Sequence, residues 1–177
     1  MKKALFLDRD GIINVDKKYI CRQEDFEFID SIFELCRFFA DKGFLIFIIT
    51  NQAGIGRGYY TDKDFLILTE WMKEQFKLNG IIISDVYYCP HHLDYGIGKY
   101  KIDCECRKPK PGMILKIANR YDVDLVNSVL IGDKIGDIKA GESANIENNF
   151  LIKSGYQEIY DFKSVKSLLS YVKEIKI

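Results

Sequence analysis

Residues Lys3 to Gly11, Lys-Ala-Leu-Phe-Leu-Asp-Arg-Asp-Gly, constrain the fold of this chain more than any other stretch. A short apolar run that ends in acidic residues is typical of a buried parallel strand, whose carboxyl end lies at the edge of an α/β sheet where active sites form. Asp8 and Asp10 are two residues apart, so in extended backbone their side chains project to one face. Two such carboxylates repel unless a cation lies between them or one is protonated. The segment predicts a site for Mg²⁺ and phosphate chemistry, although Asp-x-Asp-Gly alone is often only a turn.

The rest of the chain alternates short apolar runs with amphipathic stretches, which predicts parallel strands joined by helices. We expect further strands at residues 44–49, 85–88, 128–131 and 150–152. We expect helices at 32–39 (after Asp30 as N-cap and before Gly43), from Thr61 to Gly80, from Pro111 through 118, near 138–141, and at 164–175. The fold class is α/β: one domain over residues 1–177, with a three-layer, Rossmann-like parallel sheet flanked by helices.

The overall charge excludes some partners. The chain has 26 basic and 26 acidic residues, so no bulk field draws it toward nucleic acid or an anionic membrane. It has no apolar run of about 18 residues and no secretory signal pattern at its start. We therefore expect a cytoplasmic protein that binds neither nucleic acid nor membrane and holds any anion through local groups. We also expect a monomer, although no sequence feature establishes the oligomeric state.

Three later segments place more polar residues beside strand ends. Thr50 and Asn51 precede three glycines and Arg57, and such glycine-rich turns can direct backbone N–H groups at an anion. Residues 107–112 read Arg-Lys-Pro-Lys-Pro-Gly and offer fixed positive charge for phosphate. A third carboxylate, Asp133, follows the strand at 128–131. The alternatives are a flexible loop for the glycines and a solvated surface for the basic run.

Three of the five cysteines fall in one short segment, together with two histidines. Thiolates and an imidazole in two paired clusters can complete a closed tetrahedral Zn²⁺ site, which would be structural because no coordination position stays open. The predicted ligands are Cys89, His91, Cys104 and Cys106, in a loop at residues 89–106. The alternative is a chance cluster of small cysteines. His92 is a weaker candidate ligand, and Cys21 and Cys36 are predicted to be ordinary small apolar residues.

Taken together, these motifs resemble the haloacid dehalogenase superfamily of phosphotransferases, over nearly the whole chain to about residue 152. The segment at residues 8–11, the glycine-rich segment at 50–58, the Cys-Pro-His and Cys-x-Cys loop and the basic run at 107–112 most closely resemble the D-glycero-D-manno-heptose 1,7-bisphosphate 7-phosphatases. The resemblance implies a phosphorylated sugar as substrate, Mg²⁺ and Zn²⁺ as cofactors, and no large cap domain. Alternatives are a histidinol phosphatase, which shares a similar zinc loop, and a zinc-stabilised binding module without catalysis.

The resemblance also implies a role for each matching residue. Asp8 is the expected nucleophile and Asp10 the general acid and base. Thr50 and Lys108 are expected to hold the phosphoryl group, while Asp8, the backbone carbonyl of Asp10 and Asp133 are expected to bind Mg²⁺. Expected substrate contacts are Asp16, Tyr19, Asn51, Arg57, Arg107 and Lys134. Two features depart from the pattern, because Ile12 stands where many members have Thr and the helical extension at 154–177 has no implied role.

Overall fold

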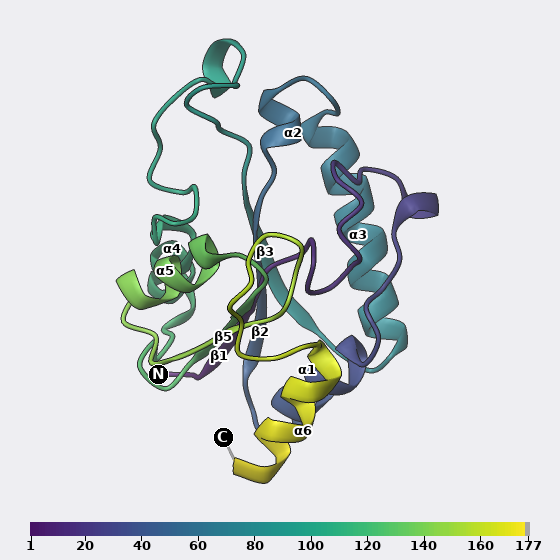
Figure 1. Cartoon of the computed structure of the whole chain (residues 1–177), viewed down its shortest axis with the longest axis vertical. Helices are drawn as coiled ribbons and strands as arrows, with labels where there is room; N and C mark the ends of the chain where they lie inside the picture. The colour runs from purple at the N-terminus through teal and green to yellow at the C-terminus, as the bar shows by residue number, and fades with distance from the viewer. Residues whose placement is uncertain (176–177) are drawn as a thin grey trace.

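The protein is built on one parallel sheet of five strands (Figure 1). The computed structural model describes residues 1–175. The strands are β1 (Ala4–Leu7), β2 (Leu45–Asn51), β3 (Ile83–Cys89), β4 (Val129–Gly132) and β5 (Asn148–Leu151). The helices are α1 (Ile32–Asp41), α2 (Ala53–Gly56), α3 (Asp62–Leu78), α4 (Gly112–Tyr121), α5 (Ile135–Ser143) and α6 (Val165–Ile175), with 3₁₀ turns η1 (Gln23–Asp25) and η2 (Gly98–Tyr100). The predicted α/β class and parallel sheet are confirmed.

Strand β1 lies at the centre of the strand order β3-β2-β1-β4-β5. Leu5 is level with Ile46 of β2 on one side and with Val129 of β4 on the other. The chain moves outward from β1 in one direction through β2 and β3, and in the other through β4 and β5. A parallel sheet has its ligand crevice at the carboxyl ends of the strands where this order reverses. That point is the end of β1, immediately before Asp8.

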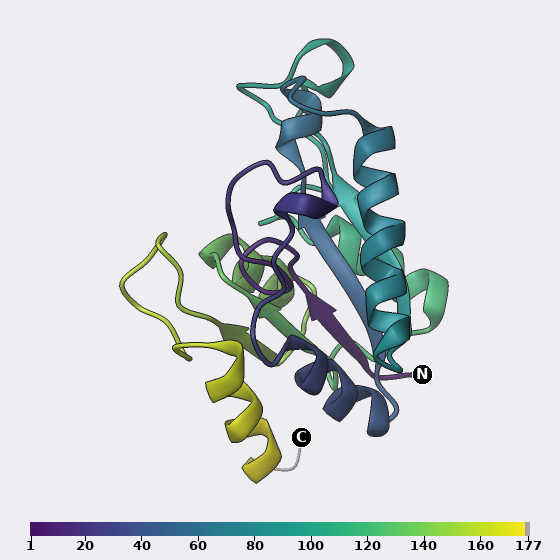
Figure 2. The same cartoon turned by 90° about the vertical axis from the view of Figure 1, so that its right-hand side faces the viewer.

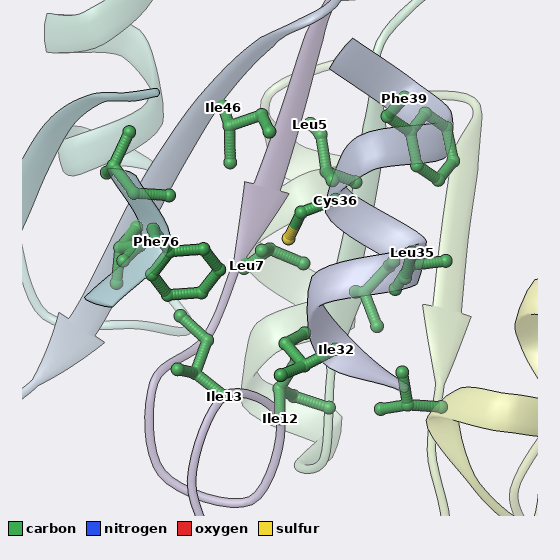
Figure 3. Packing of buried hydrophobic residues seen from close by; sticks show 14 of the residues in the cluster. Leu5, Leu7, Ile12, Ile13, Ile32, Leu35, Cys36, Phe39, Ile46 and Phe76 are labelled. Atoms are coloured by element: carbon green, nitrogen blue, oxygen red, sulfur yellow. The ribbon is translucent and has the colours of Figure 1, made fainter. Parts of the chain in front are cut away.

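The two faces of the sheet are covered by different helices (Figure 2). Leu5 and Leu7 face α1, α3 and α6, and Ala4 and Phe6 face α4 and α5. Figure 3 shows the first of these clusters, in which Ile12 is fully buried. An apolar residue at position 12 therefore contributes to the core. Among residues 1–175 the long inserts, 8–31 and 90–111, are loops that carry only single 3₁₀ turns, so no large cap covers the crevice.

Most helix ends follow the sequence signals, with one error. Thr61 caps α3 as predicted: its Oγ1 accepts a hydrogen bond from the Asp64 N–H, and Asp64 accepts one from the Thr61 N–H at 2.8 Å. The prediction of Asp30 as the cap of α1 is wrong. Ser31 occupies that position in a left-handed conformation (φ 65°), without a side-chain capping bond. The short helix α2 lies where we expected only a loop. No helix within residues 1–175 has the length and apolar character to span a bilayer.

The C-terminal part is only partly helical. The helix predicted at 164–175 is confirmed as α6. Within the predicted extension at 154–177, the residues before it are not helical: 153–161 form a loop that returns to the sheet edge at Phe162. Residues 176–177 of that prediction lie outside the described residues. Helix α6 packs against α1 and buries Val165, Leu168 and Leu169 in the core on that face.

Candidate active site

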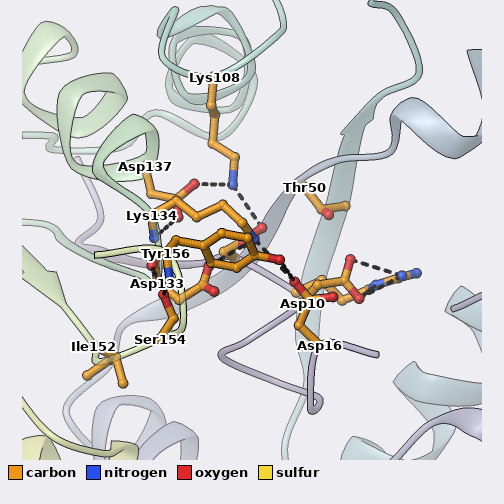
Figure 4. Close-up of polar contacts among 12 residues, drawn as sticks. Asp10, Asp16, Thr50, Lys108, Asp133, Lys134, Asp137, Ile152, Ser154 and Tyr156 are labelled. Atoms are coloured by element: carbon orange, nitrogen blue, oxygen red, sulfur yellow. Dashed lines mark hydrogen bonds and ion pairs between the residues drawn. The ribbon is translucent and has the colours of Figure 1, made fainter. Parts of the chain in front are cut away.

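A buried lysine joins two acidic residues at the carboxyl edge of the sheet (Figure 4). The Nζ atom of Lys108 lies 2.8 Å from Asp8 Oδ1 and 2.7 Å from Asp137 Oδ1, and it also donates to the backbone carbonyl of Ile49 at 2.7 Å. All three side chains are buried. Asp8 follows β1, Asp137 lies in the first turn of α5, and Lys108 comes from the loop before α4. Three segments distant in sequence thus meet at the predicted crevice.

Asp133 completes an acidic cluster that fits a divalent cation. One carboxylate oxygen from each of Asp8, Asp133 and Asp137 lies within 4.8 Å of the others. Asp133 is fully buried, and its Oδ2 atom has no hydrogen-bond partner among the described residues. Gly11 (φ 93°) passes so close that a Cβ there would lie 2.3 Å from this oxygen. Carboxylate oxygens are the ligands Mg²⁺ prefers, so the cluster fits Mg²⁺.

Burial and mutual repulsion set the protonation of this cluster. Burial, the largest influence, raises the pKa of Asp8, and the Lys108 ammonium opposes the rise without cancelling it. Burial followed by the charge of Asp8 raises the pKa of Asp133 to about 7. Burial alone would lower the pKa of Lys108, but the charges of Asp137 and Asp8 outweigh burial, so the pKa is raised. Lys108 therefore stays charged, whereas one carboxyl group takes up a proton near neutral pH when no cation is present.

Asp10 is held by a separate set of donors. The buried Arg9 donates to Asp10 Oδ1 at 2.9 Å through Nη2, which also donates to the carbonyl of Ile20 at 3.0 Å. Asn14 donates to Oδ1 at 3.0 Å, and Gln52 donates to Oδ2 at 3.1 Å. The Asp10 carboxylate is therefore fixed in orientation, while its side chain stays partly exposed toward a cavity.

The end of β2 supports both Asp10 and Lys108. Gln52 Nε2 also donates to the buried Thr50 hydroxyl at 2.8 Å, and Gln52 Oε1 accepts a bond from the buried Tyr60. The Asn51 amide donates to the Lys108 carbonyl at 3.0 Å and accepts from the Lys108 N–H at 3.1 Å. Asn51 lines the cavity, but both polar atoms of its side chain already hold the Lys108 backbone in place.

A cavity of about 450 Å³ opens beside Asp10. Five predicted substrate contacts lie in its wall, namely Asp16, Tyr19, Asn51, Arg57 and Lys134. We did not predict other wall residues, namely Lys18, Gln52, Tyr59, Tyr60 and Tyr156, and we predicted no role for Asp137. Asp137 had a detectable signal, since it lies one helical turn after Asp133. The tyrosines had none, because no local pattern marks them.

Three tyrosines surround Arg57. Its guanidinium lies 5.6, 5.0 and 4.9 Å from the ring centroids of Tyr19, Tyr59 and Tyr95. Nη1 donates to the Tyr19 hydroxyl at 2.7 Å. Such stacking restricts the long side chain before any ligand binds, so less conformational entropy is lost on binding. Arg57 is thus a preoriented cation at the rim of the cavity.

Arg107 is placed differently from our expectation of a substrate contact. Its Nη1 donates to the carbonyl of His91 at 3.1 Å, and it is not among the described residues that line the 450 Å³ cavity. The structure therefore ties Arg107 to the cysteine loop, and direct contact with substrate stays a prediction.

The four predicted zinc ligands meet in one cluster. The sulfur atom of Cys106 lies 3.1 Å from that of Cys89, 3.4 Å from that of Cys104 and 3.4 Å from Nδ1 of His91. The three cysteines form no disulfide. Three sulfurs and one imidazole are a donor set for a closed Zn²⁺ site, so the residues fit this ion. His92 lies outside the cluster, where its Nδ1 accepts bonds from the backbone N–H groups of Asp94 and Tyr95.

Comparison with known proteins gives consistent results. A family model described as HAD-hydrolase-like matches residues 105–167. A D-glycero-alpha-D-manno-heptose-1,7-bisphosphate 7-phosphatase from Campylobacter jejuni is 47% identical, over 97% of this chain and 96% of its own. The Vibrio cholerae D-glycero-beta-D-manno-heptose-1,7-bisphosphate 7-phosphatase is 46% identical, over 87% of this chain and 83% of its own. The crystal structure of D,D-heptose 1,7-bisphosphate phosphatase from B. bronchiseptica, complexed with magnesium and phosphate, has a TM-score of 0.81 at 24% identity, covering 98% of this chain and 99% of that one, and supports the fold.

Proposed function

Because this chain belongs to the heptose 1,7-bisphosphate 7-phosphatase family of haloacid dehalogenase-like hydrolases, we propose that it removes the C7 phosphate of D-glycero-D-manno-heptose 1,7-bisphosphate. The observation that carries the proposal is the buried Asp8 carboxylate, 2.8 Å from Lys108 Nζ, beside the partnerless Asp133 oxygen. A nucleophile, a phosphate-binding cation and a metal ligand are together what an aspartyl-phosphate mechanism requires.

The first step is attack of an Asp8 carboxylate oxygen on phosphorus, in line with the sugar oxygen. The bond between phosphorus and that oxygen breaks, an aspartyl phosphate forms, and Asp10 gives a proton to the departing sugar hydroxyl. In the second step Asp10 takes a proton from water, the water oxygen attacks phosphorus, and inorganic phosphate leaves with Asp8 restored. The donors Arg9, Asn14 and Gln52 support this assignment, because they fix the orientation of Asp10, two residues after Asp8, and leave its side chain partly exposed toward the cavity.

Charge is balanced by groups that the fold already holds in place. The Lys108 ammonium supplies positive charge near the phosphoryl oxygens, and the Thr50 hydroxyl donates a hydrogen bond to them, as their charge spreads in the transition state. Asp8, Asp133 and the backbone carbonyl of Asp10 would hold Mg²⁺, and the position of Asp137 adds it to the possible ligands. Mg²⁺, when bound, supplies positive charge between nucleophile and phosphate. Zn²⁺ held by the four residues of the cysteine loop would serve only to fix that loop.

The cavity supports a sugar bisphosphate as substrate. Asp10 lies at one wall, where the reacting phosphate enters, and Lys18 and the preoriented Arg57 lie in the wall of the same cavity. Their positive charges suit the second phosphate at C1, which histidinol phosphate lacks. A binding module without catalysis would need no buried acid cluster around Lys108. We place the enzyme in the cytoplasm, acting as a monomer on a free sugar phosphate in nucleotide-activated heptose synthesis.

The proposal is tested by phosphate release from a substrate panel. The panel holds the alpha and beta anomers of heptose 1,7-bisphosphate, together with histidinol phosphate, and Asp8→Asn serves as the inactive control. We expect hydrolysis of at least one heptose anomer with a kcat/KM well above that for histidinol phosphate. Faster turnover of histidinol phosphate would refute the heptose assignment, and equal phosphate release by Asp8→Asn would refute the nucleophile.

A further inference from the structure

The loop at residues 153–161, here called the strap, is attached to the strand end that carries Asp133. Ile152 and Phe162 are bridged, so the strap begins and ends at the same point of the sheet edge. Inside it, Ser154 Oγ and Gln157 Nε2 both donate to the backbone carbonyl of Asp133, at 2.8 and 2.9 Å. The strap is therefore not a free surface loop, because two side chains hold it beside the acidic cluster.

The strap brings Tyr156 into the wall of the substrate cavity (Figure 4). The Tyr156 hydroxyl donates to Asp16 Oδ2 at 2.6 Å, and its ring centroid lies 4.5 Å from Lys134 Nζ. Tyr156, Asp16 and Lys18 line both the 450 Å³ cavity and a neighbouring cavity of about 510 Å³. The hydrogen bond between Tyr156 and Asp16 thus forms part of the wall that separates the two cavities.

On the basis of the proposed function, we propose that Tyr156 is a specificity-determining residue that fixes Asp16 as an acceptor for hydroxyl groups of the sugar. Asp16 Oδ1 accepts a hydrogen bond from the Lys18 N–H at 3.0 Å, and Oδ2 accepts one from the Tyr156 hydroxyl. Lys134 Nζ forms an ion pair with Oδ2 at 3.6 Å. A carboxylate has about four lone-pair sites, so acceptor capacity remains for a ligand. A carboxylate attracts hydroxyl donors and repels phosphate. Asp16 therefore recognises the uncharged polyol between the two phosphates.

The protonation states of the pair agree with this arrangement. Burial would raise the pKa of Asp16, but hydrogen bonds from Tyr156 and Lys18 outweigh it and lower the pKa. The bond to Asp16 and then burial raise the pKa of Tyr156 to about 12. At neutral pH Asp16 is therefore ionised and Tyr156 remains a donor, so the bond persists under the conditions of an assay.

The test compares Tyr156→Phe with wild type on two substrates, the heptose bisphosphate and p-nitrophenyl phosphate, which has no sugar hydroxyls. Tyr156→Phe keeps the ring over Lys134 and removes only the donor. We expect the ratio of kcat/KM values, heptose bisphosphate over p-nitrophenyl phosphate, to fall roughly tenfold, as for loss of one hydrogen bond to a charged group. The loss should appear in KM for the sugar rather than in kcat. Tyr171→Phe on α6, where the ring packs against Phe162, is the matched control and should match wild type.

A double-mutant cycle separates this role from a structural one. In an Asp16→Asn background, Tyr156→Phe should change the specificity ratio by less than about twofold, because the bonded carboxylate is gone. An unchanged ratio in the single variant, or a parallel loss on both substrates with a lowered melting temperature, would overturn the proposal. If wild type fails to hydrolyse either heptose anomer, the proposed function fails. If wild type is active and Tyr156→Phe equals it, only the role of Tyr156 fails.

Discussion

Lys108 Nζ and Asp8 Oδ1 lie 2.8 Å apart, and the same ammonium lies 2.7 Å from Asp137 Oδ1. Before any phosphate binds, Lys108 thus already neutralises part of the acid cluster. Removing a charge from such a buried network leaves its partners unpaired, which costs more than the pair itself contributes. The proposed function therefore gives Lys108 two roles, one in phosphate binding and one in folding.

We expect Lys108→Met to lower kcat by at least roughly a hundredfold, because a fixed positive charge beside the transition state is lost. The same change should destabilise the fold by about 3 kcal/mol, because two buried carboxylates lose their cation. Initial rates and urea unfolding measure the two effects. Lys110→Met is the matched control, since Lys110 pairs with Asp103 and Glu105 at the surface and its loss should change neither quantity. An Lys108→Met protein with wild-type kcat would contradict the assignment.

We expect Asp8→Asn to lose activity without losing stability, unlike Lys108→Met, which should lose both. The amide cannot form an acyl phosphate, so activity should fall at least roughly a thousandfold. Without divalent cations the variant should be at least as stable as wild type, because one of three mutually repelling carboxylates becomes neutral. Thermal unfolding in chelator, together with phosphate release, provides the check. A strongly destabilised variant would show that the Asp8 charge serves the fold rather than the chemistry.

The sequence predicted those parts of the site that lie beside strand ends. Asp8, Thr50 and Asp133 each follow an apolar run that forms a strand. In a parallel sheet the carboxyl ends of the strands lie at one edge, however the helices pack. The cysteine cluster was equally predictable, because its ligands come from two short segments whose residue types leave few other roles. The register and strand order could not be predicted from the sequence, but they change none of these placements.

The missed residues depend on contacts that no local pattern encodes. Tyr156 meets Asp16 across 140 positions of sequence, and its strap looks like an ordinary polar connection. Tyr60 reaches Gln52 only because α2 turns the chain back, and α2 was predicted as loop. Asn51 shows the reverse case: its position was predicted, but its amide is already bound to the Lys108 backbone.

The metal-free protein should lose stability as pH rises. The pKa of Asp133 is raised from an unfolded value of 3.8 to about 7, so the folded state binds more protons between these limits. The free energy of unfolding must then fall with rising pH across that window, by at most about 1.4 kcal/mol per unit. Melting temperatures in chelator at pH 5 and pH 8 test this, and Asp133→Asn should flatten the difference. Mg²⁺ should restore stability more at pH 8. If the melting temperatures of wild type and Asp133→Asn differed by the same amount at pH 5 and pH 8, the raised pKa of Asp133 would be contradicted.

The cysteine cluster should bind about one zinc ion per chain, measured by atomic emission after dialysis. Cys104→Ser should lower the zinc content and the melting temperature, because the loop at 90–111 has few apolar residues to hold it. Cys21→Ser is the control, since Cys21 lies outside the cluster. The Cys21→Ser protein should bind as much zinc as wild type. Washed wild-type protein that is folded, active and zinc-free would refute the structural role.

Arg57 provides the last test, which concerns the second phosphate. The guanidinium lies about 5 Å from the rings of Tyr59 and Tyr95, which restrict its motion, and Arg57 lines the cavity. Lysine keeps the charge but loses the stacked, bidentate geometry. We therefore expect Arg57→Lys to raise KM for the bisphosphate roughly tenfold, and to change KM for the matching 7-monophosphate less than about twofold. Arg120→Lys on α4 is the matched control, because Arg120 lies at the surface beside Asp85. Equal losses on both sugars would place Arg57 against the sugar itself rather than against the phosphate at C1.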